Sequence, residues 1–256
     1  MTESNSWHNE VPSDSVFKAE RKLGIQALGL SSNLRSEALG LLTRVSEQGF
    51  GHKNSWMGVP IIRLPEDLIL QQEIIWNERP DLVVESGVAR GGGLIFNASM
   101  QEMCGVTPRV LGLDNKIFDH TSSALNESRY ARQITVLEGD SVSEQAKEMV
   151  ASFAKTSQKT LLVLDSDHSS EHVLKELQTF VPLLPIGSII LVCDTLIDEL
   201  PAGTYENRSW SNGLGPLHAI KSFLRENQTV EPYMREETRA LMFSEIRDGV
   251  LRKVSL

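Results

Sequence analysis

From residue 80 onward, short apolar runs rich in Val, Ile and Leu alternate with longer amphipathic stretches. This alternation is typical of βα units around a parallel sheet that is covered by helices on both faces. It predicts strands at 82–87, 109–114, 134–140, 160–167 and 188–195. The pattern therefore indicates a Rossmann-like α/β fold with a mostly parallel sheet.

The segments around this core have patterns of their own. Polar helices are expected within residues 15–50, one helix at "PEDLILQQEIIWNERP" and another at "LHAIKSFLREN". The last residues, "ALMFSEIRDGVLRKV", suggest an antiparallel hairpin that turns at "RDG". The aperiodic stretch 196–216 is too long for an ordinary connection and is expected to cover a site. We expect an N-terminal helical extension, 1–55, for oligomerisation or substrate cover, and one domain over 56–256.

Acidic residues recur at the ends of the predicted strands. They are Glu85, Asp114, Asp140, Asp165 and Asp194. Ligands of open α/β sheets bind outside the carboxyl ends of the strands. These five side chains are therefore expected to face one crevice.

Composition limits the possible functions. A formal net charge of -9 argues against a nucleic-acid partner, which would need a positive surface. No apolar run approaches the roughly 20 residues of a membrane helix, and the N-terminus lacks a signal-peptide pattern. These features favour a cytoplasmic protein with a small-molecule substrate. Cys104 and Cys193 are expected to be buried thiols.

A glycine-rich turn follows the first predicted strand in "DLVVESGVARGGG". Gly87, Gly91 and Gly92 are placed where a backbone can turn tightly and approach a ligand. The spacing is not the G-x-G-x-x-G of dinucleotide-binding loops, and Glu85 would repel a pyrophosphate. An acid suits a cationic ligand such as S-adenosylmethionine, which carries a sulfonium and an ammonium group. Alternatively, the turn only links strand to helix.

Several motifs together resemble a known family. "WMGVP", "QQEII", "RPDLVVESGVARGGG", "LGLD", "LEGDS", "LLVLDSDHSSEHVLKEL" and "GSIILVCDT" are similar, in order and register, to the cephalosporin-hydroxylase-like group of S-adenosylmethionine-dependent O-methyltransferases, which includes rhamnosyl methyltransferases. The resemblance covers roughly 56–254. It implies a class I methyltransferase fold and O-methyl transfer. It also implies a cofactor site that includes Glu85, Gly87, Gly91, Gly92, Asp114, Asp140 and Ser141, with the last two near the adenine.

The segment "LLVLDSDHSS" places Asp165 at a strand end and His168 shortly after it. Carboxylates suit Mg²⁺, and an imidazole suits proton transfer. The resemblance implies that Asp165 and Asp194 bind the metal and that His168 is the base, with Asp165 also in the catalytic set. One position departs from the family. Some members have a Glu-Asp pair at the end of this strand, whereas this sequence has Cys193-Asp194, and a thiol is a poorer Mg²⁺ ligand than a carboxylate.

Structural interpretations compete at several positions. His168 could cap a helix or be a buried structural histidine, and Asp167 could cap the helix that follows. His172 is expected on a helix surface. Trp76 is expected in a core or an interface, whereas Trp210 is the better candidate for substrate contact because it lies in the long loop.

The sequence thus favours an O-methyltransferase that acts on a hydroxyl of a small molecule, a sugar or a glycosylated natural product. Two alternatives stay open: an accessory protein in a natural-product oxidation or methoxylation pathway, and an NAD-dependent oxidoreductase. The apolar residues of the N-terminal helices predict a homo-oligomer.

Overall fold

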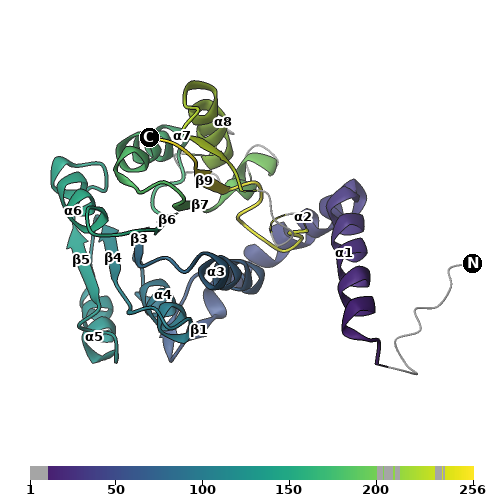
Figure 1. Cartoon of the computed structure of the whole chain (residues 1–256), viewed down its shortest axis with the longest axis horizontal. Coiled ribbons are helices and arrows are strands. Elements are labelled where there is room, and N and C mark those ends of the chain that lie inside the picture. The colour runs from purple at the N-terminus through teal and green to yellow at the C-terminus, as the bar shows by residue number, and fades with distance from the viewer. Residues whose placement is uncertain (1–10, 201–203, 205–209, 211–213, 234–237, 239) are drawn as a thin grey trace, which may run out of the picture.

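The computed structural model describes residues 11–200, 204, 210, 214–233, 238 and 240–256. Its centre is a seven-stranded sheet with the order β5-β4-β3-β6-β7-β9-β8 (Figure 1). The strands from β5 to β7 are parallel, and β9 pairs antiparallel with both β7 and β8. The predicted mostly parallel α/β fold is confirmed.

All five predicted parallel strands are present, although each is shorter than the sequence pattern suggested. The strands of the large sheet are β3 (Leu82–Ser86), β4 (Val110–Asp114), β5 (Ile134–Glu138), β6 (Thr160–Leu164), β7 (Ile189–Val192), β8 (Val230–Pro232) and β9 (Val250–Lys253). The strands β6 and β7 stop before Asp165 and Asp194, because these acids leave the sheet toward the site. A separate small hairpin pairs β1 (Ser55–Trp56) with β2 (Val59–Pro60).

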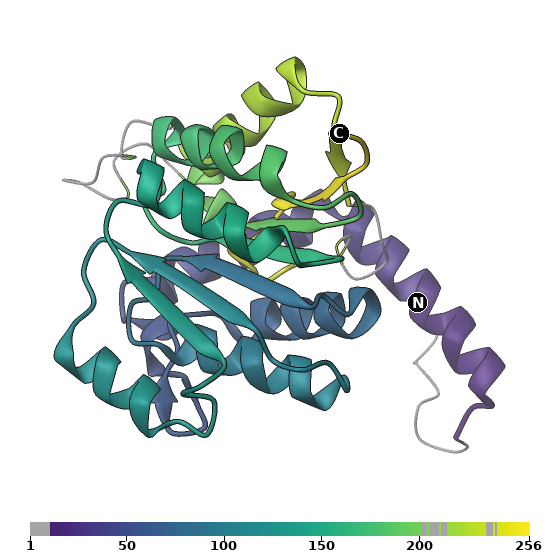
Figure 2. The same cartoon turned by 60° about the vertical axis from the view of Figure 1, so that its left-hand side comes forward.

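Helices cover both faces of the sheet (Figures 1 and 2). Their bounds are α3 (Pro65–Glu78), α4 (Gly92–Met103), α5 (Asp119–Glu127), α6 (Glu144–Ala154), α7 (Ser170–Phe180) and α8 (Pro216–Glu226), with short 3₁₀ turns η1 (Phe50–Lys53), η2 (Val181–Leu183) and η3 (Thr195–Glu199). One apolar core joins α3 and α4 to one face, and a second joins α6, α7 and α8 to the other. Both faces of β3, β4, β6 and β7 are buried, as their continuous apolar runs require, whereas the edge strand β5 is largely exposed.

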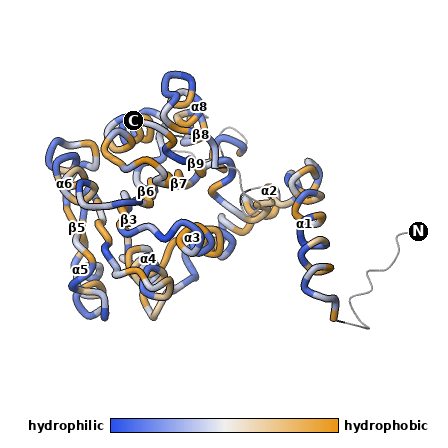
Figure 3. Tube along the Cα trace, viewed as in Figure 1, coloured by the Kyte–Doolittle hydropathy of each residue, from blue (hydrophilic) through white to orange (hydrophobic). Residues whose placement is uncertain are grey.

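The N-terminal helices α1 (Asp14–Leu30) and α2 (Ser32–Ser46) confirm the predicted polar helices. Helix α1 has no buried residue and projects away from the sheet (Figures 1 and 2). Its apolar and polar residues are interspersed (Figure 3). Helix α2 does contact the body, because Leu42 packs against Leu64 and Leu196.

The C-terminal antiparallel pair is also confirmed, but its first strand is β8 rather than the residues just before "RDG". The segment 240–248 instead runs without strand pairing and brings Glu245 and Ile246 to the site cavity. Most of the expected covering loop at 196–216 lies outside the described residues. Within the part of the chain that is described, no helix is long and apolar enough to cross a membrane.

The sheet order fixes where a ligand can bind. β3 is the first strand of the large sheet along the chain, and its neighbours are β4 on one side and β6 on the other. The strand order reverses at this point, and open α/β sheets bind ligands in the crevice at the carboxyl ends there. The chain leaves β3 through the glycine turn and β6 through the Asp165–His168 segment, so both predicted motifs lie at this crevice.

Candidate active site

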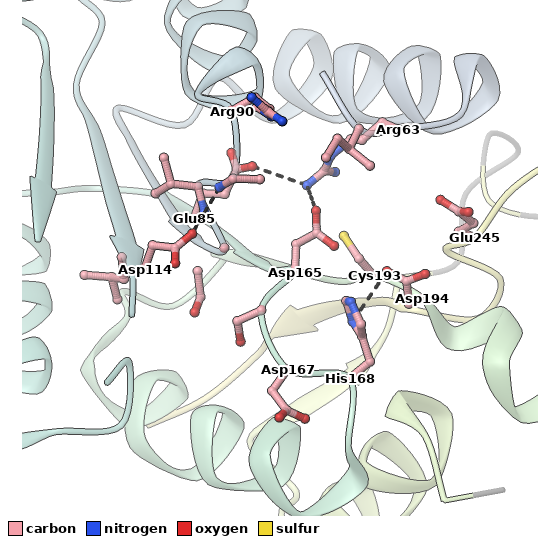
Figure 4. A pocket seen from close by; sticks show the side chains of 18 of the residues that line it. Arg63, Glu85, Arg90, Asp114, Asp165, Asp167, His168, Cys193, Asp194 and Glu245 are labelled. Carbon is pink, nitrogen blue, oxygen red and sulfur yellow. Dashed lines mark hydrogen bonds and ion pairs between the residues drawn. The ribbon is translucent and has the colours of Figure 1, made fainter. Parts of the chain in front are cut away.

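A cavity of about 830 Å³ lies at the carboxyl ends of β3 to β7 (Figure 4). This volume falls in the range of roughly 300–1,000 Å³ that is typical of small-molecule sites. The five strand-end acids all line it: Glu85, Asp114, Asp140, Asp165 and Asp194. The prediction that they face one crevice is therefore confirmed.

Two glycines of the turn are required by contacts with other backbone segments of the protein. Gly87 has φ +98°, and a Cβ there would overlap the carbonyl oxygen of Asp165. A Cβ at Gly92 would overlap the carbonyl oxygen of Pro60. These glycines are thus needed for close packing of the protein backbone, a requirement that the sequence interpretation attributed to a ligand.

The carboxylate of Asp114 organises the same turn. Its Oδ2 accepts hydrogen bonds from the backbone N–H of Val88, at 2.8 Å, and of Ala89, at 3.0 Å. Its Oδ1 accepts one from the N–H of Lys116 at 3.0 Å. Asp114 is only half-buried and lines the cavity, so it can support the turn and still accept a hydrogen bond from a ligand.

Glu85 belongs to a ring of buried side chains that the sequence did not reveal. Arg63 donates to Glu85 at 3.4 Å and to Gln71 at 2.7 Å. Gln71 donates to Asn97 at 2.5 Å, and Asn97 donates back to Glu85 at 2.6 Å. A buried carboxylate on a strand needs a positive partner. The position of Glu85 in an apolar strand was therefore the one sequence signal that could have predicted a nearby arginine.

Arg63 also joins the two halves of the site, because it donates to Asp165 Oδ2 at 3.0 Å. Glu85 on β3, Asp165 after β6 and Cys193 after β7 line the same cavity, and Arg63 points toward Glu85 and Asp165 (Figure 4). Arg63 itself is only 4% exposed. Its guanidinium therefore neutralises charge in a part of the cavity that water reaches poorly.

Burial dominates the acid–base properties of this wall. It raises the pKa of Glu85 to about 7, against the opposing effect of Arg63. It raises the pKa of Asp165 to about 6, where Arg63 opposes the shift and Asp194 adds to it. Such perturbed carboxyl groups in a cleft are typical of functional sites.

Asp165, His168 and Asp194 come together as predicted. One possible ligand atom from each residue lies within 4.8 Å of those of the other two. His168 Nδ1 is 3.4 Å from Asp194 Oδ2. Asp194 has φ +57°, an uncommon conformation for a residue other than glycine, and such strain concentrates at functional sites. The cluster can hold a divalent cation, or Asp194 can orient His168 as a proton acceptor.

Two further carboxylates lie next to this cluster. Asp67 is buried and accepts hydrogen bonds from the hydroxyl of Ser244 and, at 3.1 Å, from the N–H of Glu245. Burial raises the pKa of Asp67 to about 7 and raises that of Glu245 well above its ordinary value. Burial also raises the pKa of the Cys193 thiol well above its ordinary value, so this thiol adds no negative charge to the wall.

The structure also shows the surroundings of four other residues with expected roles. The prediction of a surface position for His172 is wrong, because it lines the cavity and places Nε2 3.0 Å from Ser141 Oγ. Asp167 accepts from the N–H of Ser169 at 2.7 Å, but Ser169 is the residue that caps α7. Trp76 is 49% exposed, so it is not a core residue. Trp210 packs edge-on against His168 at 5.2 Å between ring centroids and lines the cavity.

Comparison with known proteins identifies the family. The model of the family "Rhamnosyl O-methyltransferase/CmcI" matches residues 48–254. The chain belongs to this family. The predicted class, an O-methyltransferase that uses S-adenosylmethionine, is thereby confirmed.

Individual relatives agree with this result. The chain is 28% identical to the "Rhamnosyl O-methyltransferase" of Mycobacterium tuberculosis H37Rv over 245 residues, which cover 89% of this chain and 94% of the relative. It is 29% identical to the protein of the same name from Mycobacterium leprae over 176 residues, covering 67% and 71%.

Solved structures show the same fold at lower sequence identity. The apo structure of CmcI matches with a TM-score of 0.58 and 19% identity, covering 80% of this chain and 78% of the other. A putative caffeoyl-CoA O-methyltransferase from Staphylococcus aureus matches with a TM-score of 0.56 and 16% identity, covering 93% and 100%. The expected class I methyltransferase fold is confirmed.

Proposed function

We propose that this protein transfers a methyl group from S-adenosylmethionine to a hydroxyl of a sugar or of a glycosylated small molecule. The observation that carries the proposal is the cavity at the strand-order reversal, in which His168 lies beside Asp165 and Asp194. A proton acceptor among carboxylates is what O-methylation needs, because a neutral alcohol is a weak nucleophile.

The cofactor is proposed to lie between the glycine turn and the strand ends next to it. Glu85, Asp114, Asp140 and Ser141 would hold it, and Gly87, Gly91 and Gly92 shape the turn beside it. Bound there, S-adenosylmethionine supplies an electrophilic methyl group. Glu85 already pairs with Arg63, so its charge toward a ligand ammonium is partly compensated.

The residues of the cluster fit a hard divalent cation. Asp165 and Asp194 offer carboxylate oxygens and His168 an imidazole, and Mg²⁺ prefers oxygen ligands and keeps some of its waters. A CmcI structure that contains Mg and S-adenosylmethionine has the same fold as this chain at 18% identity. Bound here, Mg²⁺ would lower the pKa of the acceptor hydroxyl.

His168 is proposed to take the proton from the acceptor hydroxyl while the methyl group passes from sulfur to oxygen. The products are then the methyl ether, S-adenosylhomocysteine and a proton on His168. Because Asp194 lies near Nδ1, it favours the tautomer with hydrogen on Nδ1 and leaves Nε2 as the acceptor. Trp210 restricts the imidazole from the side.

The proposed acceptor class is taken from the relatives, which are named rhamnosyl O-methyltransferases. The test incubates the protein with S-adenosylmethionine, Mg²⁺ and acceptors with or without a rhamnosyl group, and detects methylated product by mass spectrometry. Isothermal titration with S-adenosylmethionine and NAD tests the oxidoreductase alternative. Binding of NAD without binding of S-adenosylmethionine would overturn the proposal. The accessory-protein alternative predicts binding without methyl transfer.

Asp114→Ala should weaken S-adenosylmethionine binding by roughly 10- to 150-fold, because it removes a charge-assisted hydrogen bond worth about 1.5–3 kcal/mol. Isothermal titration measures the loss, and Glu127→Ala, an exposed acid on the helix after β4, serves as the control. Unchanged affinity in Asp114→Ala would show that the turn binds another ligand. Glu85→Ala is a poorer test, because it also leaves Arg63 with fewer buried partners.

The N-terminal extension, 1–55, is proposed to form contacts between subunits. Its helix α1 exposes Phe17, Leu23 and Leu30 by 46%, 66% and 87%. Light scattering should report a mass above that of one chain, and deletion of residues 1–30 should lower it. A single-chain mass for the full-length protein would contradict the predicted oligomer. The cytoplasmic location also stays a prediction.

A further inference from the structure

A second buried polar network lies under the cavity wall on the α7 side of the sheet. Its centre is the carboxylate of Glu176, which is fully buried. Glu176 Oε1 accepts hydrogen bonds from the hydroxyls of Ser86 at 2.5 Å, Ser141 at 2.7 Å and Ser166 at 2.8 Å. One oxygen thus connects residues at the ends of β3, β5 and β6.

This network lowers the stability of the fold. Glu176 Oε2 is buried and has no hydrogen-bond partner. The imidazole of His172, one helical turn earlier on α7, places Nε2 3.5 Å from Glu176 Oε1. Because an unsatisfied buried acceptor costs free energy, such an arrangement calls for an explanation other than stability.

The direction of the hydroxyl hydrogens matters for a ligand. A serine hydroxyl has one hydrogen to donate and two lone pairs that accept. Ser141 and Ser166 both line the cavity, and both donate their hydrogen to Glu176. Ser141 Oγ also lies 3.0 Å from His172 Nε2, so one of its lone pairs accepts from that nitrogen when it carries hydrogen. Toward the cavity they therefore offer only lone pairs. Asp140 and Asp167, which line the same wall, are also acceptors when ionised.

We propose that Glu176 is a positioning residue for cofactor recognition: it holds these hydroxyl hydrogens away from the cavity and so makes this wall select a ligand edge that donates hydrogen bonds. The inference rests on the proposed use of S-adenosylmethionine. The adenine base of that cofactor presents a 6-amino donor. An inosine base presents a 6-oxo acceptor at the same place, which would face lone pairs.

The test compares two product analogues, S-adenosylhomocysteine and S-inosylhomocysteine, by isothermal titration. Wild-type protein should bind the adenosyl compound at least about tenfold more tightly. The reason is that the 6-oxo acceptor of the inosyl compound would face serine lone pairs and form no hydrogen bond. Glu176→Leu removes the acceptor, which lets the serine hydroxyls turn toward the cavity. The ratio of the two affinities should then fall toward one.

Two control variants separate recognition from structure. Ser86→Ala removes one hydrogen bond to the same oxygen. Ser86 borders the cavity too, but its side chain is fully buried and cannot contact a ligand, so the affinity ratio should be retained. Glu171→Gln changes an exposed residue of the same helix, which pairs with Lys175, and should leave both affinities unchanged. A purely structural role for Glu176 would weaken both ligands equally and leave their ratio unchanged.

Ser141→Ala provides a second route if Glu176→Leu does not fold. It should weaken the adenosyl compound and leave the inosyl compound nearly unaffected. The inference is overturned if S-adenosylhomocysteine still binds and the affinity ratio is unchanged in Glu176→Leu. The same holds if the ratio is unchanged in both Ser141→Ala and Ser166→Ala. Failure of the wild type to bind S-adenosylhomocysteine would instead overturn the proposed function itself.

Discussion

His168→Ala should lower the turnover number by roughly 10²- to 10⁴-fold, the usual contribution of a positioned general base. The affinity for S-adenosylmethionine should be retained, because no hydrogen bond between His168 and the glycine turn or Asp114 is seen among the described residues. Single-turnover assays give the rate, and isothermal titration gives the affinity. Added imidazole should restore part of the lost rate.

The pH profile distinguishes a base from a packing residue. A pure packing role for His168 would leave the shape of the pH–rate profile unchanged in His168→Ala, whereas loss of the base should change it. Protonation of Asp165, whose pKa is about 6, should lower the rate in acid in both proteins. His218→Ala, an exposed histidine on α8, is the matched control and should be fully active. Normal turnover in His168→Ala would show that the segment after β6 is structural.

Asp165→Asn should abolish methyl transfer while cofactor binding persists, and EDTA should have the same effect on the wild type. The reason is that Asp165 and Asp194 are the carboxylates best placed to hold a cation. Titration with Mn²⁺, followed by the electron paramagnetic resonance of the free ion, measures cation affinity directly. Affinity should fall as the pH drops through about 6, because protonation then removes the charge of Asp165.

Two comparisons make the metal prediction specific. Asp248→Asn, an exposed acid that pairs with Arg35, should leave cation affinity unchanged. Cys193→Glu should tighten cation binding, since it adds a hard ligand beside Asp194. If EDTA has no effect while His168→Ala is inactive, the metal half of the mechanism is wrong and His168 acts without a cation.

The parts of the site that follow from local pattern were predictable. An apolar run that ends at an acid predicts both a buried parallel strand and the position of its last side chain. Glu85, Asp114 and Asp165 were placed in this way, because the carboxyl ends of neighbouring parallel strands meet at one edge. The order of the sheet then follows from the family resemblance rather than from any single motif.

The partners of these acids were not predictable. Arg63 and Asp165 are 102 positions apart, and Ser86 and Glu176 are 90 positions apart. Nothing in the local sequence around Arg63 or Glu176 distinguishes them from solvated charged residues. His172 was placed on the surface for the same reason, although α7 turns that face of the helix toward Ser141.

By itself, then, the sequence determined the alternating strands and helices, the glycine turn and the row of strand-end acids, because these depend on the period of apolar residues and on the conformational needs of single residues. Only the tertiary structure decided which buried charges are compensated. It pairs Glu85 with Arg63, and it places Glu176 where the hydroxyls of Ser141 and Ser166 donate to it. The physical reason is that burial and charge pairing depend on segments far apart in the chain, whose packing brings each group its partner or removes its water.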